Sequence, residues 1–174
     1  MLIGMPPRRI YDAERHAQFI TFSCYRRRRL LDHPRMKDEL VALMGEKLAD
    51  HAGICSGYVI MPDHVHAIVW FAEPGVISRF MKSWKQTSSI LLKRVLRGVA
   101  PHYAAEIPLT EPFWQAKYYP FNLYSETKAR EKLQYMHLNP VRAGVVERPS
   151  DWKWSSARYY ESGEDVGVPI EWIF

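Results

Sequence analysis

The chain has 174 residues, a hydrophobic fraction of 47% and six tryptophans, a composition that excludes a disordered protein and predicts one domain with a substantial core. Its net charge of +5 is a modest basic excess, compatible with nucleic acid or with an ordinary solvated surface. No apolar run approaches the roughly 18 residues of a membrane span. Two cysteines without a C-x-x-C spacing argue against a zinc site and favour a cytoplasmic location.

The first half of the chain predicts two strands around a helix. Residues 18–25 alternate Phe, Thr, Phe and Cys among β-branched neighbours, a pattern typical of a strand. Residues 34–53 repeat apolar side chains at spacings of three and four, which predicts a helix closed by Gly53. Residues 55–61 form a second expected strand, and the pair Pro62-Asp63 turns the chain into the next apolar run.

The second half predicts two more helices and a fourth strand. Residues 76–95 carry an apolar stripe opposite a basic face, which indicates a long helix. Residues 113–122 are aromatic and extended, which predicts a fourth strand. A third helix runs from Ser125 to near Asn139, because Pro140 cannot continue it. The order strand, helix, strand, strand, helix, strand, helix fits an α+β fold, a ferredoxin-like antiparallel sheet with helices packed on one face. We expect one domain over 1–174, with 147–174 as a C-terminal tail packed on or near it.

Two histidines interrupt the most apolar stretch, residues 58–71. Alternate side chains of a strand point to the same face, so His64 and His66 should project side by side, as half of a metal site does. The H-x-H spacing alone is a weak signal, because two ordinary histidines can share it. Asp63 either orients His64 as a hydrogen-bond acceptor or serves only the turn.

The third predicted helix carries a polar row beside its apolar stripe. Glu131, Tyr135 and Asn139 follow one another at intervals of four, so Tyr135 and Asn139 can face the same neighbour. A hydroxyl and an amide oxygen one turn apart could both reach a metal-bound phosphate. The alternative is that Tyr135 packs at the edge of the core with its hydroxyl in water. His137 should face away from Tyr135, so it is not expected to act as its base.

Four segments of the chain together resemble a known family. Residues 61–66 (MPDHVH), 113–115 (FWQ), 135–146 (YMHLNPVRAGVV) and 152–157 (WKWSSA) resemble, in this order, the REP-associated tyrosine transposases of the HUH endonucleases. The resemblance covers roughly residues 19–160, while 163–174 match nothing in it. It implies a ferredoxin-like sheet with the His pair on a central strand and the tyrosine on a helix laid against it.

The resemblance also implies a reaction. His64 and His66 fall on the metal ligands of that family, Tyr135 on its nucleophile, and Asn139 on a third ligand position. The expected activity is that of a transposase, a metal-dependent endonuclease and strand transferase acting on single-stranded DNA through a 5′-phosphotyrosine and a free 3′-hydroxyl. The expected substrates are hairpins of REP-like palindromes, and the protein would be nucleoid-associated, as a monomer or homodimer. The expected cofactor is Mg²⁺ or Mn²⁺, and imidazole ligands suit Mn²⁺ at least as well.

Several basic and aromatic side chains are candidates for DNA contact, although a charge run is often only a solvated surface. Tyr118 and Tyr119 rival Tyr135 by residue type, but an aromatic strand pair is more typical of a core. Two other functions stay open: a hairpin-binding protein that does not cleave, and a hydrolase in which water attacks. The candidate DNA-binding residues are Arg26, Arg27, Arg28, Arg29, Lys82, Trp84, Lys85 and Trp152, with Trp114 a further stacking candidate.

Overall fold

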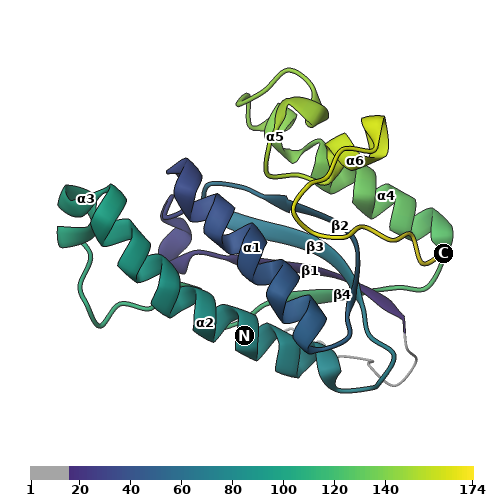
Figure 1. The fold of residues 1–174 in the computed structure, drawn as a ribbon, viewed down its shortest axis with the longest axis horizontal. Helices are drawn as coiled ribbons and strands as arrows, with labels where there is room; N and C mark the ends of the chain where they lie inside the picture. Colours follow the sequence, from purple (N-terminus) through teal and green to yellow (C-terminus); the bar gives the residue numbers. More distant parts are fainter. Residues whose placement is uncertain (1–15) are drawn as a thin grey trace, which may run out of the picture.

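A computed structural model describes residues 16–174 as a four-stranded antiparallel sheet with helices (Figure 1). The strand order is β2-β3-β1-β4, which confirms the predicted α+β class. In chain order the elements are β1 (Ala17–Ser23), α1 (Pro34–Asp50), β2 (Ile54–Ile60), β3 (His64–Trp70), α2 (Val76–Val99), α3 (Pro101–Ala105), β4 (Tyr119–Leu123), α4 (Glu126–His137), α5 (Asn139–Arg142) and α6 (Ala157–Ser162), with short 3-10 helices at Tyr25–Arg27 and Pro149–Asp151.

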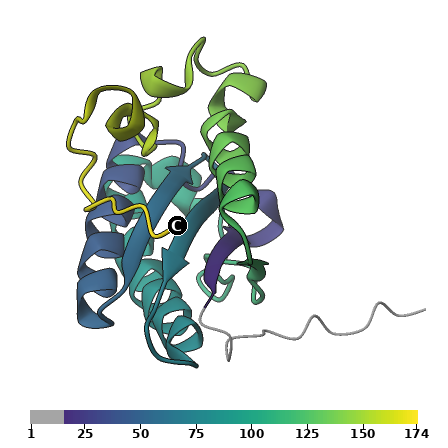
Figure 2. The same cartoon turned by 90° about the vertical axis from the view of Figure 1, so that its right-hand side faces the viewer.

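Helices cover both faces of the sheet, so the expectation that they pack on one face was wrong. In Figure 2, α4 stands on the opposite side of the sheet from α1 and α2. Ile20 and Val65 face the core under α1 and α2, whereas Phe19 and Ile68 face α4. The reason lies in the central strands β1 and β3, which carry apolar side chains on both faces and therefore need a cover on each.

The helix ends follow local sequence signals. Pro34 opens α1 at a position where its missing N–H costs nothing, and the Nδ1 of His33 accepts the N–H of Arg35 at 3.2 Å. The hydroxyl of Ser125 caps α4 by accepting the N–H of Lys128 at 3.2 Å. The predicted boundaries of these two helices therefore hold to within a few residues.

Two elements differ from the prediction. The helix α2 continues four residues past 95, to Val99, because Leu96 extends its buried stripe. The strand β4 begins only at Tyr119, because the preceding Phe113 and Trp114 pack into the core instead of pairing along the sheet. Trp114 keeps a single bridge to Cys24.

The outer edge of β2 is occupied by residues 147–174, here called the C-terminal segment. The N–H of Ile60 donates to the carbonyl of Trp154, and the N–H of Ser156 donates to the carbonyl of Tyr58, both at 2.9 Å. Further along the same edge, the N–H of Glu171 donates to the carbonyl of Cys55 at 2.9 Å. These bonds satisfy backbone groups that an edge strand would otherwise present to solvent.

Both cysteines of the chain are buried and neither forms a disulfide. Burial raises the pKa of Cys55 to about 12 and also raises the pKa of Cys24. Neither thiol therefore ionises readily in the folded protein. Within residues 16–174, no helix is both long and apolar enough to cross a membrane.

Candidate active site

The strand β3 presents both histidines of the pair on the face that α4 covers. Their side chains project from alternate residues, and their ring centroids lie 4.9 Å apart. His66 is buried, whereas His64 is partly exposed. In the register with β1, His66 lies opposite Thr21 and His64 opposite Ser23.

Each histidine is held by a hydrogen bond at Nδ1. The Nδ1 of His64 lies 2.6 Å from a carboxylate oxygen of Asp63, and the Nδ1 of His66 lies 2.7 Å from the hydroxyl of Thr21. Within residues 16–174, neither Nε2 atom has a hydrogen-bond partner. Metal-binding histidines commonly have one ring nitrogen held in this way while the other binds the ion. The donor set therefore fits a metal bound through the two Nε2 atoms.

The charges around the pair favour a neutral His66 beside an ionised carboxylate. Burial, helped by the positive charges of His64, Arg27 and Lys132, lowers the pKa of His66 to about 3. Partial burial alone would raise the pKa of Asp63, but its hydrogen bond to His64 and the charges of His64 and Arg27 outweigh burial and lower it. Asp63 also pairs with Arg27 at 3.0 Å, so it both orients His64 and anchors the turn.

The helix α4 brings Tyr135 against the histidines. The ring centroid of Tyr135 lies 5.7 Å from that of His66, edge to face, and 6.2 Å from that of Phe19. Phe19 in turn stacks on His66 at 5.2 Å. Although its ring makes these contacts, the residue stays 43% exposed. The structure thus gathers a tyrosine and two histidines from separate elements at one accessible place.

Asn139 lies at the junction between α4 and α5, one turn after Tyr135. Its Nδ2 donates to the backbone carbonyl of Tyr135 at 3.4 Å, and within residues 16–174 it forms no hydrogen bond with either histidine. In the same part of the chain, no group of three or more His, Cys, Asp or Glu side chains could hold a metal.

Two cations flank the ring of Tyr135, and sequence reasoning missed both. The Nζ of Lys132 lies 5.6 Å from the ring centroid, and the guanidinium carbon of Arg142 lies 5.2 Å from it. Arg142 also donates to the carbonyl of Tyr135 at 3.5 Å. Lys132 precedes Tyr135 by three helical residues, a spacing that could have identified it. Arg142 and Thr21 depend on a chain turn and a strand register, which give no comparable signal.

The four consecutive arginines lie in and after a tight turn, where Arg26 and Arg27 adopt positive φ values of 54° and 56°. Each arginine faces a carboxylate, so much of its charge is compensated within the protein. Arg27 lies nearest the His pair, through its contact with Asp63. The pairs are Arg26–Glu111 at 3.8 Å, Arg27–Asp63 at 3.0 Å, Arg28–Glu111 at 2.8 Å and Arg29–Asp32 at 2.8 Å.

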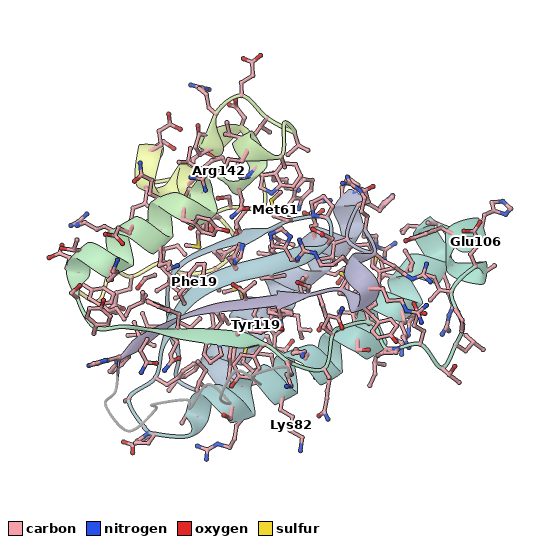
Figure 3. The ribbon with its side chains drawn as sticks, turned by 180° about the vertical axis from the view of Figure 1, so that it is seen from behind. Phe19, Met61, Lys82, Glu106, Tyr119 and Arg142 are labelled. Atoms are coloured by element: carbon pink, nitrogen blue, oxygen red, sulfur yellow. The ribbon has the colours of Figure 1, made fainter. Side chains whose placement is uncertain are left out.

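Among the other DNA-binding candidates, the prediction for Trp84 was wrong. Trp84 is completely buried in the apolar stripe of α2, so it has no surface on which a base could stack. Lys85 donates to the carbonyls of Gln115 and Ala116 at 2.7 and 2.9 Å, so its ammonium group binds the chain that leads into β4. Lys82 is exposed but projects from the opposite side of the molecule to Arg142 (Figure 3).

The tryptophans and tyrosines outside the site have mixed environments. Trp152 is partly buried and donates from Nε1 to the carbonyl of Ile60 at 2.9 Å, and Trp114 is buried. Tyr118 packs partly against the core, as expected. Tyr119 instead is 57% exposed on β4, an edge strand of the sheet.

A comparison with protein families decides the classification. The family described as "Transposase IS200 like" matches residues 13–138, which include His64, His66 and Tyr135. The chain belongs to this family. The IS200-like match ends before Asn139, so α5 and the C-terminal segment lie beyond it.

Two further comparisons, with a curated protein and with a solved structure, extend this result. A REP-associated tyrosine transposase of Escherichia coli (strain K12) is 25% identical over 121 residues, which are 67% of this chain and 61% of that protein. The match thus spans less than two thirds of the relative's length. The solved structure of a REP-associated tyrosine transposase bound to a REP hairpin is similar with a TM-score of 0.67, over 98% of this chain and 92% of that one. At 22% identity, that likeness shows a shared fold.

Proposed function

We propose that this protein is a transposase that cleaves and rejoins single-stranded DNA, with Tyr135 as the nucleophile. The observation that carries the proposal is the contact between the rings of Tyr135 and His66, at 5.7 Å, in an accessible site. Membership of the IS200-like family supports the transposase role. REP-like DNA hairpins are the proposed substrate class, because a similar fold has been solved bound to one.

The proposed cofactor is Mg²⁺ or Mn²⁺, held by His64 and His66 with Asn139 as the third ligand. The two Nε2 atoms support this assignment, because their partner nitrogens are already engaged by Asp63 and Thr21. Imidazole nitrogen is a better ligand for Mn²⁺ than for Mg²⁺, which prefers oxygen. When bound, such an ion polarises a phosphate and offsets the charge that develops on it.

The proposed reaction is a transesterification. The hydroxyl oxygen of Tyr135 forms a bond to phosphorus, and the bond from phosphorus to the 3′-oxygen breaks. The phenol proton leaves to a base or to water, and the departing 3′-oxygen takes up a proton to become a hydroxyl. Because one phosphate ester replaces another, the reverse attack can rejoin strands without ATP.

The DNA around the cleaved phosphate has several proposed contacts. Arg27 is the best placed of the predicted cations, since it is exposed and contacts Asp63 beside the His pair. Within residues 16–174, no hydrogen bond, ion pair or ring contact connects any of the other exposed or partly exposed candidates to Asp63, the His pair or Tyr135. These further proposed contacts are Arg26, Arg28, Arg29, Lys82, Lys85 and Trp152.

The test is detection of a covalent protein-DNA adduct on a denaturing gel. The probe is a labelled single-stranded hairpin oligonucleotide from palindromic DNA flanking the gene, with Mn²⁺ or Mg²⁺. We expect an adduct with the wild type and none with Tyr135→Phe. The matched control is Tyr159→Phe, which removes the hydroxyl of a tyrosine with a similar exposure, 38%, on α6.

Three outcomes would contradict the proposal. An adduct that persists in Tyr135→Phe would mean that another residue is the nucleophile. Cleavage without an adduct would favour attack by water. Binding of the hairpin without cleavage, across the palindromes tested, would favour a DNA-binding protein that does not cut.

A further inference from the structure

Lys132 occupies an unusual position beside Tyr135. It lies on α4, three residues before the tyrosine, and its side chain is partly buried. Its Nζ lies 4.9 Å from the ring centroid of Phe121, 5.2 Å from that of Phe19 and 5.6 Å from that of Tyr135. These rings come from β4, β1 and α4, so the ammonium group lies where three elements meet.

The charge of Lys132 has no acidic partner in residues 16–174. Its neighbours on α4 differ, because Lys128 pairs with Glu131 and Arg130 pairs with Glu126, both at 2.6 Å. Lys132 also donates no hydrogen bond within that part of the chain. Ring faces attract an ammonium group but do not accept its three N–H donors as oxygen atoms do. The donors of Lys132 are therefore available to an external acceptor.

The surrounding rings also restrict where that donor group can lie. A lysine side chain in solution samples many rotamers, and ordering it costs conformational entropy. Here Phe19, which contacts Lys132, stacks on His66 at 5.2 Å and meets Tyr135. The ammonium group is thus held beside the ring of Tyr135, and beside the ring of Phe19 that stacks on the buried His66, before any substrate arrives.

We propose that Lys132 binds the phosphate that Tyr135 attacks and stabilises the charge that accumulates on its oxygens in the transition state. This inference rests on the proposed function and adds a catalytic residue to it. As the new bond to Tyr135 forms and the bond to the 3′-oxygen breaks, the non-bridging oxygens carry the negative charge. A pre-positioned ammonium group stabilises that charge without having to reorganise.

A purely structural role for Lys132 makes a different prediction. Its aliphatic stem could simply cover Phe19 and Phe121 while its charge stays in water. Lys132→Met separates the two roles, because methionine keeps an unbranched apolar stem and loses only the ammonium group. Lys128→Met is the matched control, since it removes an ion-paired lysine one turn earlier on the same helix.

The first measurement is the single-turnover rate of adduct formation with saturating hairpin oligonucleotide and Mn²⁺. We expect Lys132→Met to react about 10- to 100-fold more slowly, Lys132→Arg to recover part of the loss, and Lys128→Met to match the wild type. Thermal melting of each variant checks that it is folded. If the wild type forms an adduct and Lys132→Met forms it equally fast, the inference is wrong and the proposed function stands.

The second measurement identifies the phosphate through a binding readout, once cleavage by the wild type has located the cleaved position. Binding is measured without metal, in a Tyr135→Phe background, to oligonucleotides carrying one uncharged methylphosphonate, either at the mapped cleavage position or two nucleotides away. We expect the methylphosphonate at the cleavage position to weaken binding about 10-fold when Lys132 is present, and to have no effect in Lys132→Met. Equal losses with and without Lys132 would refute the contact. Absence of any wild-type adduct would instead refute the proposed function.

Discussion

At the scale of single residues, the two histidines are oriented by hydrogen bonds of different origin. Asp63, adjacent in sequence, holds His64 with a charged acceptor at 2.6 Å. Thr21, from the neighbouring strand, holds His66 with a neutral hydroxyl at 2.7 Å. In the tautomer that leaves Nε2 unprotonated, each Nδ1–H donates to its partner. Both partners therefore fix which nitrogen is available to a metal.

Replacing Thr21 by valine should weaken metal binding without unfolding the sheet. Valine has nearly the shape of threonine and is favoured in strands, but it cannot accept the hydrogen bond of His66. We expect Thr21→Val to bind Mn²⁺ about 10- to 100-fold more weakly than the wild type, measured by titration calorimetry. Thr87→Val, on the exposed face of α2, is the control. An unchanged affinity would mean that Thr21 does not help to orient His66.

The sequence predicted the site residues whose signals are local, and it failed where the signal is spatial. Strand alternation was enough to predict that His64 and His66 project side by side. Helical spacing only placed Tyr135 and Asn139 on one face of a helix, and the resemblance to a known family singled out Tyr135. The role of Thr21 depends on which residue of β1 lies opposite His66. That strand register cannot be predicted from a single sequence. Trp84 was misassigned because its residue type suggested base stacking, although its spacing already placed it in the buried stripe of α2.

At the scale of elements, the close approach of α4 to the sheet determines where Tyr135 lies. Gly57 in β2 permits that approach: a β-carbon there would lie 2.5 Å from side-chain carbons of both Leu133 and Met136. Leu133 and Met136 anchor the buried face of α4, on either side of Tyr135 in sequence. The geometry of the site therefore depends on a residue that does not touch it.

A methyl group at position 57 should disturb α4. We expect Gly57→Ala to lower the free energy of unfolding by about 1–3 kcal/mol, because Leu133 and Met136 must leave their packed positions. The rate of adduct formation should fall with it. Gly98→Ala is the matched control, since its β-carbon meets nothing within 4 Å in a helix, where alanine is favoured. Urea unfolding of both variants checks the expectation, and equal stability of Gly57→Ala and the wild type would contradict it.

The sequence predicted element types better than their arrangement. Spacings of three and four identified α1, α2 and α4, since helical periodicity is a local property. The same periodicity says which face of a helix is buried but not against which face of a sheet, so the placement of α4 was wrong. The start of β4 was wrong because aromatic residues suit strands and cores alike: Phe22 meets the ring of Trp114 at 4.8 Å inside the core.

At the scale of the whole molecule, a buried hydrogen bond links α4 to the C-terminal segment. The Nε2 of His137 lies 2.8 Å from the hydroxyl of Ser156, and that hydroxyl also accepts the N–H of Tyr58 at 2.9 Å. Burial lowers the pKa of His137 from 6.5 to about 4. The folded protein therefore keeps this histidine neutral at pH values where an unfolded chain would protonate it.

This difference in pKa predicts a loss of stability in acid. Between pH 6.5 and 4 the unfolded chain binds a proton at His137 that the folded protein does not, so stability falls as the pH drops through this range. We expect the wild type to lose up to about 3 kcal/mol relative to His137→Gln, measured by urea unfolding at several pH values. His66 is present in both proteins and contributes equally to the pH dependence of each, so its contribution cancels in the comparison. His102→Gln, at an exposed position in α3, should follow the wild type, and parallel curves for His137→Gln would contradict the prediction.

The burial of Cys24 and Cys55 makes the folded protein unreactive toward thiol reagents. The sequence contains no other cysteine, so a single cysteine introduced at an exposed position, such as Ser162, would be the one group that a maleimide dye could modify. Site-specific fluorescent labelling would then need no replacement of the natural cysteines. Movements of the C-terminal segment during DNA binding could be followed in a protein whose core is unaltered.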